Sequence, residues 1–428
     1  MKCRVFAAAA VLAGAAGTAA AQPALRPLRP LTIEQAVQEA LQHNLGLFAQ
    51  QAGLASADAA IVTARLRPNP VLSAEAVNQD WLGTGFNDQN GAGPQEYAAH
   101  VDVPFEMGGK RERRVDLATQ ARTVAGAQYE DAVRHLRLDV TLAAIDVLEA
   151  KSKLQLAQSN YAQLQTLQAL NDRRLQSGAI AQVEVSRSRV AMLQYAATVR
   201  SAQLDLDAAR LKLLPLLGHP PTDPPVDIVD DLRLAPSVSP PDLAALQQAA
   251  RETRPDLRAA AADQARTQAD LRLQVAQGKV DYTVGAEYRR QQGVNGKGNL
   301  LGLFVSVPLP VFNRNQGEIA RAGADQEHAA RTIAALQSDV AAEVAGAFQE
   351  YESSRQLLIE IERDLLKPSE DARQATAYMY QAGATSLIDV LDAQRAYNDT
   401  MDTYYSAQAT YRRAHAKLAL ITGKDMLP

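Results

Sequence analysis

Cysteine is almost absent from this sequence of 428 residues, in which Cys3 is the only one. It stands in the charged start Met1–Arg4, which is followed by an apolar run and by Ala19-Ala-Ala21, the pattern of a cleaved secretory signal. We expect residues 1–21 to be removed and Gln22 to begin the mature chain. That chain then has no cysteine, which excludes disulfides and lipid attachment to a cysteine just after the apolar run.

Signatures of catalysis and of metal or nucleic-acid binding are missing as well. The six histidines and six methionines are scattered without the spacing of metal ligands. Gly108-Gly-Lys110 lacks the glycine spacing and the following Ser or Thr of a phosphate-binding loop. The net charge is -4 at pH 7, and no Lys/Arg cluster is interleaved with aromatic residues. We expect no enzyme activity, no cofactor, no metal site and no nucleic-acid partner.

Long apolar runs are also lacking after the signal, where no stretch offers the ~20 consecutive apolar residues of a membrane-spanning helix. Two predicted β-hairpins, residues 71–105 and 282–308, alternate apolar and polar residues instead, most clearly over Tyr282–Tyr288. We expect their turns at 83–94 and 291–299. Strands of about ten residues span an outer membrane when tilted. The alternative is a pair of soluble hairpins packed on helices.

The sequence does contain one very long predicted helix, Lys110–Gln176, which has no proline and a single glycine, Gly126. Its apolar residues follow alternating spacings of four and three from Leu136 to Leu164. This period is typical of helices that supercoil around one another. Such a helix would measure roughly 100 Å, so it must lie against other long helices.

The same register recurs from Val340 to Leu365, each position 204 residues after its counterpart. Other pairs, such as Gln176–Ala179 and Gln381–Ala384, agree to within a few insertions. We therefore infer a tandem duplication, with a kink at Pro368 in the second long helix. The predicted divisions of the chain are a signal peptide (1–21), a first repeat (22–214, with a long helical hairpin at 109–214), a proline-rich linker (215–241), a second repeat (242–422, with a long helical hairpin at 316–422) and a C-terminal tail (423–428).

The two hairpins supply too few strands for a closed barrel. Open strand edges cannot stand in lipid, because their N–H and C=O groups would be unpaired. Two copies would supply about eight strands and three copies about twelve, and only the larger number leaves a comfortable aqueous lumen. If the strands cross a membrane, the chain must oligomerise.

Two segments, Val103–Arg111 and Gly383–Gln394, together with the duplicated layout, resemble the TolC family of outer-membrane efflux channels. The resemblance covers nearly the whole mature chain. It implies an α+β efflux duct protomer, with four strands of a trimeric 12-stranded β-barrel and a long α-helical coiled-coil barrel. It also implies a passive channel in the outer membrane that extends into the periplasm, contacts outer-membrane lipid and docks through a periplasmic adaptor onto an inner-membrane pump.

The segment Glu106–Arg111 looks most like the outer-membrane components of cobalt-zinc-cadmium resistance pumps of the RND type. That likeness implies export of heavy-metal cations. A multidrug or type I secretion channel is an alternative. A periplasmic coiled-coil adaptor is another, although an adaptor has no need for lipid-facing hairpins.

Asp389 and Asp392 stand three apart near the start of a predicted helix, so both project from one face. The resemblance implies that they form rings of charge in a threefold assembly and close the periplasmic end of the tunnel. Glu184 and Tyr380 match positions that help to tie the inner helices shut. The sequence departs from the best-known member at Thr385, where a latch arginine is expected, and we consider Arg173, Arg174 or Arg187 as substitutes. The alternative for Asp389 is a capping box with Ser386.

The turns between the long helices are the expected contacts with the adaptor, at Gly178 and Ala179 in the first repeat and at Gly383 and Ala384 in the second. The alternative is that small residues merely allow tight turns.

Overall fold

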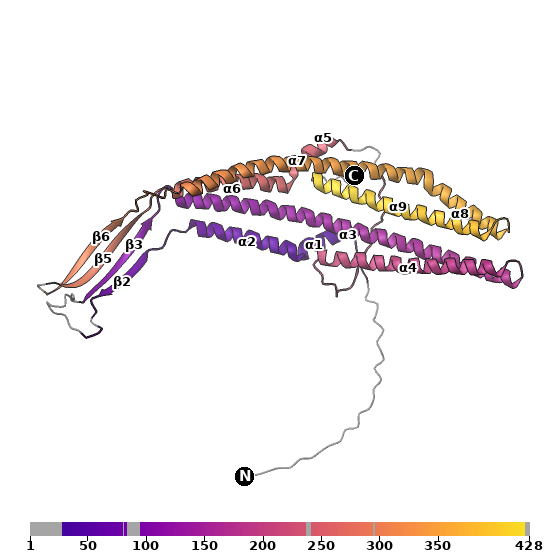
Figure 1. Cartoon of the computed structure of the whole chain (residues 1–428), viewed down its shortest axis with the longest axis horizontal. Coiled ribbons are helices and arrows are strands. Elements are labelled where there is room, and N and C mark those ends of the chain that lie inside the picture. The colour runs from indigo at the N-terminus through magenta and orange to yellow at the C-terminus, as the bar shows by residue number, and fades with distance from the viewer. Residues whose placement is uncertain (1–27, 80, 84–94, 237–240, 294–295, 424–428) are drawn as a thin grey trace, which may run out of the picture.

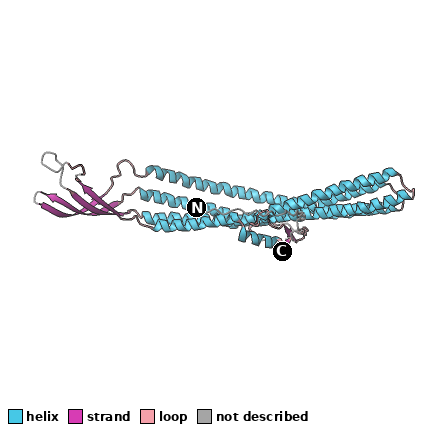
Figure 2. Ribbon diagram, turned by 90° about the horizontal axis from the view of Figure 1, so that it is seen from below, coloured by secondary structure: helices cyan, strands magenta, loops and turns pink. Residues whose placement is uncertain are grey.

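The computed structural model describes residues 28–79, 81–83, 95–236, 241–293 and 296–423. The molecule is elongated, with a β-sheet at one end and the tips of two helical hairpins at the other (Figure 1, Figure 2). The sheet and the tips are therefore separated by the full length of the helices.

The longest helix, α3 (Lys110–Gln176), runs over 67 residues, the range expected from the sequence. It extends from the sheet to one tip, and α4 (Gln182–Leu216) returns beside it (Figure 1). In the second repeat, α7 (Gln316–Glu360) and α8 (Leu366–Gln381) lead to the other tip, from which α9 (Leu387–Thr422) returns. Two helical hairpins thus lie side by side at the end far from the sheet.

The interruption in the second long helix is a π-helical turn, η1 (Ile361–Leu365), which precedes Pro368. We expected a kink at Pro368 itself. Proline lacks an N–H and its ring clashes with the carbonyl four residues earlier, that of Asp364. The clash therefore falls inside η1, where the wider helical turn accommodates it.

Each repeat begins with a pair of shorter helices, α1 (Ile33–His43) and α2 (Leu45–Arg65) in the first, and α5 (Leu243–Thr253) and α6 (Pro255–Gln277) in the second. Thr32 and Gln35 form the expected capping box at the start of α1. In the described part of the chain, α2 is the one helix with the length and apolar composition of a membrane span, which we had not expected. One such helix is weak evidence for a span, and only 6% of its most apolar window is buried.

The sheet contains four antiparallel strands in the order β2 (Val71–Val77), β3 (Glu96–Phe105), β5 (Tyr282–Gly293) and β6 (Gly296–Ser306). Two details differ from expectation. β2 ends at Val77 rather than near residue 82, because Asn78 adopts a left-handed backbone with φ 54°. β5 and β6 pair as far as Gly293 and Gly296, so most of the turn expected at 291–299 is strand. Residues 84–94 of the other expected turn lie outside the described residues.

Within the linker expected at 215–241, residues 215–236 contain regular structure that we did not expect. Pro215 still belongs to α4, and Val226–Ile228 form a strand, β4, that pairs in parallel with β1 (Arg29–Leu31). Local sequence could not predict this strand, because its partner lies almost 200 residues away in the chain.

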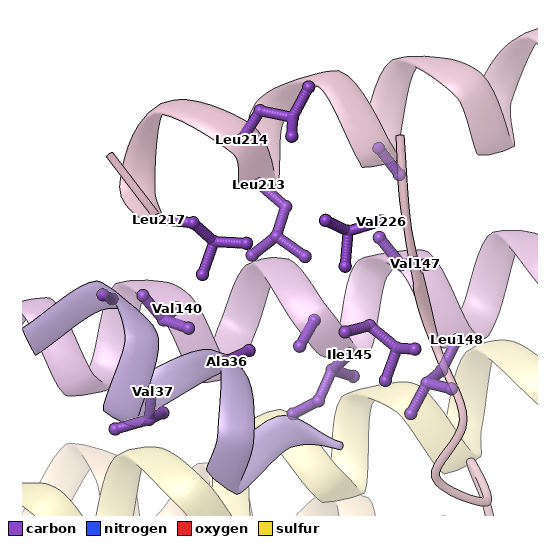
Figure 3. Close-up of a cluster of buried hydrophobic side chains, with 14 of the residues drawn as sticks. Ala36, Val37, Val140, Ile145, Val147, Leu148, Leu213, Leu214, Leu217 and Val226 are labelled. Atoms are coloured by element: carbon purple, nitrogen blue, oxygen red, sulfur yellow. The ribbon is translucent and has the colours of Figure 1, made fainter. Parts of the chain in front are cut away.

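The main apolar core lies near the middle of the molecule, where α1, α3, α4 and β4 meet. Side chains from all four elements converge there, among them Val37, Val140, Ile145, Leu213 and Val226 (Figure 3). A second cluster joins α5, α7 and α9 around Tyr351 and Tyr411. These clusters hold the middle of the two helical hairpins together and leave the tips to other contacts.

Candidate functional site

Both helical tips end in the same backbone motif. Gly178 and Gly383 adopt φ angles of 76° and 75°, the left-handed conformation that favours glycine. The N–H of Ala179 donates to the carbonyl of Arg174 and that of Ala384 to the carbonyl of Met379, both at 2.8 Å. Each turn is therefore a Schellman motif. Ala179 and Ala384 are both exposed, so the tips present small side chains around a fixed backbone.

Asp389 caps the start of α9. Its carboxylate accepts hydrogen bonds from the Ser386 N–H at 3.1 Å, the Ser386 hydroxyl at 2.7 Å and the Thr385 hydroxyl at 2.7 Å. The capping box expected as the alternative is thus present. These bonds from Ser386 and Thr385 hold the pKa of Asp389 below its ordinary value. Asp389 is nevertheless exposed, so its negative charge remains at the surface of the tip.

Asp392 is exposed one helical turn further along α9. Its carboxylate lies 3.4 Å from the guanidinium of Arg395. Both groups are more than half exposed, with side-chain exposures of 63% and 59%, so the pair is weak. Asp392, Arg187 and Ile388 line a shallow groove between α4 and α9. The structure therefore leaves both aspartates of the expected gate at the surface of one protomer.

Tyr380 joins the ends of α8 and α3. Its side chain is 4% exposed, and its hydroxyl donates to Asn171 Oδ1 at 2.7 Å. The guanidinium of Arg174 lies 5.0 Å from the centre of the Tyr380 ring. Arg174 also donates to the carbonyls of Tyr380 at 3.2 Å and Gln381 at 2.7 Å. We call Asn171, Arg174 and Tyr380 the tip clasp.

The tip clasp accounts for two expectations from the sequence. Of the three arginines considered as substitutes for a latch, Arg174 is the one that contacts Tyr380. It lies at the carboxyl end of α8, where a cation is favoured. Burial raises the pKa of Tyr380, and the nearby carboxylate of Glu184 raises it further, whereas Arg174 opposes the shift. Glu184 thus lies close enough to Tyr380 to act on it electrostatically. Thr385 donates to Asp389 instead of forming a latch.

Sequence reasoning missed the polar residues that are buried between the helices near the tips. Asn160 of α3 accepts a hydrogen bond from Gln394 Nε2 at 3.0 Å and donates to Asn398. Ser188 of α4 donates to Gln168 Oε1 at 2.7 Å. The sequence did offer a signal, because polar residues continue at helical spacing on the inward face of α3 after Leu154. A polar group in a helical interface specifies the register of the helices at a cost in stability.

The sheet has one apolar and one charged face. Leu301, Leu303 and Val305 form an apolar row with exposures of 88%, 86% and 71%. On the other face, Arg289 of β5 contacts the carboxylates of Glu287 at 2.7 Å and Glu96 at 3.2 Å. Such a sheet can separate lipid from water, provided that its open edges are paired.

The segment Glu106–Arg111 connects this sheet to the helices. The Lys110 ammonium lies 2.7 Å from Asp281 Oδ2, and Glu106 pairs with Arg114. Both contacts fix the angle at which the strands leave the helices. Within the described ranges, no group of three or more His, Cys, Asp or Glu side chains could hold a metal ion.

The chain is similar to known proteins in family, in sequence and in fold. The family model described as "Outer membrane efflux protein" matches residues 36–219 and 246–424. The cobalt-zinc-cadmium resistance protein CzcC of Cupriavidus metallidurans is 27% identical over 367 residues, which cover 86% of this chain and 84% of CzcC. The pyoverdine export outer membrane protein OpmQ of Pseudomonas putida is 27% identical over 402 residues, covering 88% of this chain and 82% of OpmQ.

The fold has similar solved structures. The open state of the outer membrane channel MtrE of Neisseria gonorrhoeae superposes with a TM-score of 0.74 at 17% sequence identity, covering 92% of this chain and 89% of MtrE. At this identity the similarity concerns the fold alone. The expected fold class, an α+β duct protomer, is confirmed.

Proposed function

The chain belongs to the outer membrane efflux protein family, and we propose from this premise that it is the outer-membrane component of a tripartite system that exports heavy-metal cations. The observation that carries the proposal is an amphipathic four-stranded sheet joined to helices roughly 100 Å long. Strands of this kind suit the outer membrane, and helices of this length suit the periplasm. The chain is then a passive conduit with no catalytic step, driven by a partner pump.

The family assignment favours this channel over the periplasmic adaptor that the sequence left open. It also places the protein in the outer membrane. A multidrug or type I secretion channel would differ from the proposed metal exporter only in its cargo and its partner pump. It remains the competing proposal.

The proposed assembly is a homotrimer. Among the described residues, the two outer strands of the sheet, β2 and β6, each have one partner strand, and an unpaired edge is unstable in lipid. Three copies would supply about twelve strands and close the barrel. Leu45 and Val62 of α2 and Leu66, which follows its last residue, are 73%, 61% and 61% exposed, so apolar side chains are available to a neighbouring copy.

We expect the purified protein in mild detergent to have the mass of three chains by light scattering. The reason is that β2 of one copy would pair with β6 of the next in a closed ring. A monodisperse monomer that inserts into outer-membrane vesicles would contradict the trimer.

The proposed gate lies at the helical tips. In a threefold assembly the exposed carboxylates of Asp389 and Asp392 would form two rings of negative charge, which favour cations and narrow the exit. The tip clasp, with Glu184 beside Tyr380, would hold the ends of α3 and α8 together at rest. Supporting this role, both aspartates are exposed although Tyr380, nine residues before Asp389, is buried.

Two relatives differ in the cargo that their names give. CzcC is named for cobalt, zinc and cadmium resistance and OpmQ for pyoverdine export. A conduit needs no tight metal site, since tight binding slows release. We prefer metal cations because the motif Glu106–Arg111 and the name of CzcC agree.

Deleting this chain is expected to lower the tolerated concentration of zinc, cobalt or cadmium by about tenfold while leaving tolerance of antibiotics and detergents unchanged. The reason is that the pump would lose its exit through the outer membrane. Growth would be measured across graded concentrations, with the intact chain supplied from a plasmid as control. Sensitivity to antibiotics or detergents alone would instead assign the channel to a multidrug system.

Cysteines introduced at Ala179 and Ala384 are expected to cross-link to a periplasmic adaptor. Both side chains are exposed at the Schellman turns, which are the part of the chain farthest from the sheet (Figure 1). Cleavage of the signal would remove Cys3, so these thiols would be alone in the mature chain. A cysteine at Ser201, which is exposed far from the tip on α4, is the matched control. Equal adduct at all three sites would contradict specific docking by the tips.

A further inference from the structure

The apolar row of β6 continues in the connection that follows the strand. β6 ends at Ser306, but apolar residues keep to alternate positions at Val307, Leu309 and Val311. Leu309, Val311 and the next residue, Phe312, are 80%, 62% and 91% exposed. The connection between β6 and α7 therefore presents a run of apolar side chains at the surface of the molecule.

The part of the row that lies on β6 is too short to cross a bilayer. Leu301 and Val305 are four residues apart, which corresponds to about 14 Å along a strand. The apolar band of an outer-membrane barrel is about 25 Å tall, and the tilt of its strands shortens the row further. Lys297 and Asn299, which precede Leu301 at alternate positions, are polar. The row can therefore lengthen only toward the helices.

The backbone of this connection suits the border of a bilayer. Pro308 and Pro310 have no N–H, and the N–H of Val311 donates to the carbonyl of Leu309 at 2.9 Å. Half of residues 307–312 therefore offer no free N–H. An unpaired N–H is costly in hydrocarbon, so the prolines reduce the cost of placing a segment without strand pairing against lipid.

Aromatic side chains mark the same end of the sheet. Phe105, the last residue of β3, pairs with Tyr282, the first residue of β5. Their rings are stacked, with centroids 5.2 Å apart. The pairing of Thr283 with Ser306 places Tyr282 next to the position of Val307. Aromatic residues gather at both borders of an outer-membrane barrel, so this pair indicates a border at the helical end of the sheet.

Three connections between the sheet and the helices touch one another at this border. A Cβ added at Gly108 would lie 2.7 Å from Cδ of Lys279. A Cβ added at Gly278 would lie 2.7 Å from the carbonyl oxygen of Arg314. These contacts bring the three connections to one level. We call them the junction collar, which consists of residues 106–109, 278–281 and 307–315.

The junction collar and the first turn of α3 carry cations that no carboxylate neutralises. The two carboxylates of the collar, those of Glu106 and Asp281, already pair with Arg114 and Lys110. Three exposed cations have no carboxylate partner among the described residues, namely Lys279, Arg314 and, in the first turn of α3, Arg113. Long basic side chains beside an apolar surface can reach headgroup phosphates while their stems stay on that surface.

We propose that the junction collar binds anionic phospholipid of the periplasmic leaflet, with the apolar side chains of residues 307–312 among the acyl chains and the three unpaired cations at the phosphates. The inference rests on the proposed function, since it needs the sheet to cross the outer membrane. It adds a surface that fixes the height of the channel in that membrane. A second copy fits this surface less well, because a strand paired with β6 lies in the plane of the sheet, whereas the side chains of the row stand out of that plane.

The test is quenching of tryptophan fluorescence by brominated lipids. The chain has one tryptophan, Trp81, so Phe312→Trp is made in a Trp81→Phe background. The full chain is reconstituted into vesicles of phosphatidylcholine and phosphatidylglycerol, with one of the two lipids brominated at a time. We expect Phe312→Trp to lose a share of its fluorescence similar to that lost by Leu303→Trp, in the apolar row of β6. Leu204→Trp on α4, where the native side chain is 70% exposed, should keep its fluorescence.

The same vesicles test the role of charge. Brominated phosphatidylglycerol should quench Phe312→Trp more strongly than brominated phosphatidylcholine at the same mole fraction. Adding Arg113→Gln and Arg314→Gln should lower this preference by up to about fivefold for each cation, the effect of one basic residue near an anionic surface. The matched control is Arg189→Gln/Arg200→Gln, which removes two exposed cations from α4 and should leave the preference unchanged.

The outcomes separate this inference from the proposed function. Quenching of Leu303→Trp without quenching of Phe312→Trp overturns the inference and leaves the sheet in the membrane, with a second copy as the cover of the connection. Quenching of neither variant overturns the inference and the proposed placement of the sheet together. Equal quenching by the two lipids overturns the proposed selectivity for anionic phospholipid.

Discussion

Neutralising Asp389 and Asp392 together is expected to raise single-channel conductance severalfold and to weaken block by divalent cations at least about tenfold. Each aspartate contributes one exposed carboxylate per chain, so a threefold assembly would lose two rings of charge at its narrowest point. Divalent cations respond most strongly because their attraction to each carboxylate is twice that of a monovalent ion. The measurement is conductance of Asp389→Asn/Asp392→Asn in planar bilayers, with and without added divalent salt.

A matched control is the pair Asp325→Asn/Glu327→Gln on α7. These carboxylates have side-chain exposures of 49% and 66%, and they lie toward the sheet rather than at the tip. They should leave divalent block unchanged. An equal change in both double variants would assign the effect to overall charge rather than to a gate.

The capping geometry at the start of α9 gives this prediction a pH dependence. The pKa of Asp389 lies below its ordinary value because Ser386 and Thr385 donate hydrogen bonds to the carboxylate. Because of this lowered pKa, the ionised carboxylate stabilises the fold above its unfolded pKa, and that effect is lost as the pH falls through the folded pKa. The same ionised carboxylate would be the group that binds divalent cations. Divalent block should therefore persist down to about pH 4 and weaken only below it.

Gly218→Ala is expected to reduce the free energy of unfolding by about 3 kcal/mol or more. Gly218 has a φ of 81°, a conformation that costs an alanine about 1–2 kcal/mol. In addition, its new Cβ would lie 2.1 Å from the carbonyl oxygen of His43 and 2.6 Å from the carbonyl carbon. Both atoms are backbone at the end of α1, whose other face is fixed in the main core, so relief requires the helix to move.

Gly178→Ala isolates the cost of the backbone angle alone. Gly178 has a similar φ of 76°, but a Cβ there would meet nothing within 4 Å. We expect a loss of about 1 kcal/mol. Chemical denaturation in detergent, followed by circular dichroism, would compare the two. Similar losses in both variants would mean that α1 yields to the new methyl group.

Local periodicity predicted the elements that carry their own signal. The heptad spacing of Lys110–Gln176 extends without interruption, so the bounds of α3 were predictable from the sequence alone. Alternation located the strands around Tyr282, and the box of Ser386 with Asp389 was visible in the order of residues. The bounds of the hairpin turns were less predictable, because pairing with β6 keeps Gly and Asn residues in the ladder.

The contacts of the candidate site were only partly predictable. The likeness to a known family singled out Tyr380 and the two aspartates, and Arg174 was one of three arginines considered as substitutes where the sequence departs from that family. It did not reveal that Arg174 stacks on Tyr380, that Asn171 accepts a hydrogen bond from the Tyr380 hydroxyl, or that the Thr385 hydroxyl donates to Asp389. These pairings depend on the rotation of each helix about its own axis, which spacing alone does not fix between separate helices.

The sequence by itself determined that this chain is duplicated, that each copy joins a β-hairpin to a very long helical hairpin, and that cysteine after Cys3, catalytic motifs and metal-ligand spacing are missing. Each of these features is encoded within one segment or in a comparison of two segments. Only the tertiary structure decided that β4 pairs with β1 and that Tyr380 of α8 meets Asn171 of α3. Those outcomes join residues about 200 positions apart, and they follow from how the helices pack and rotate rather than from any local pattern.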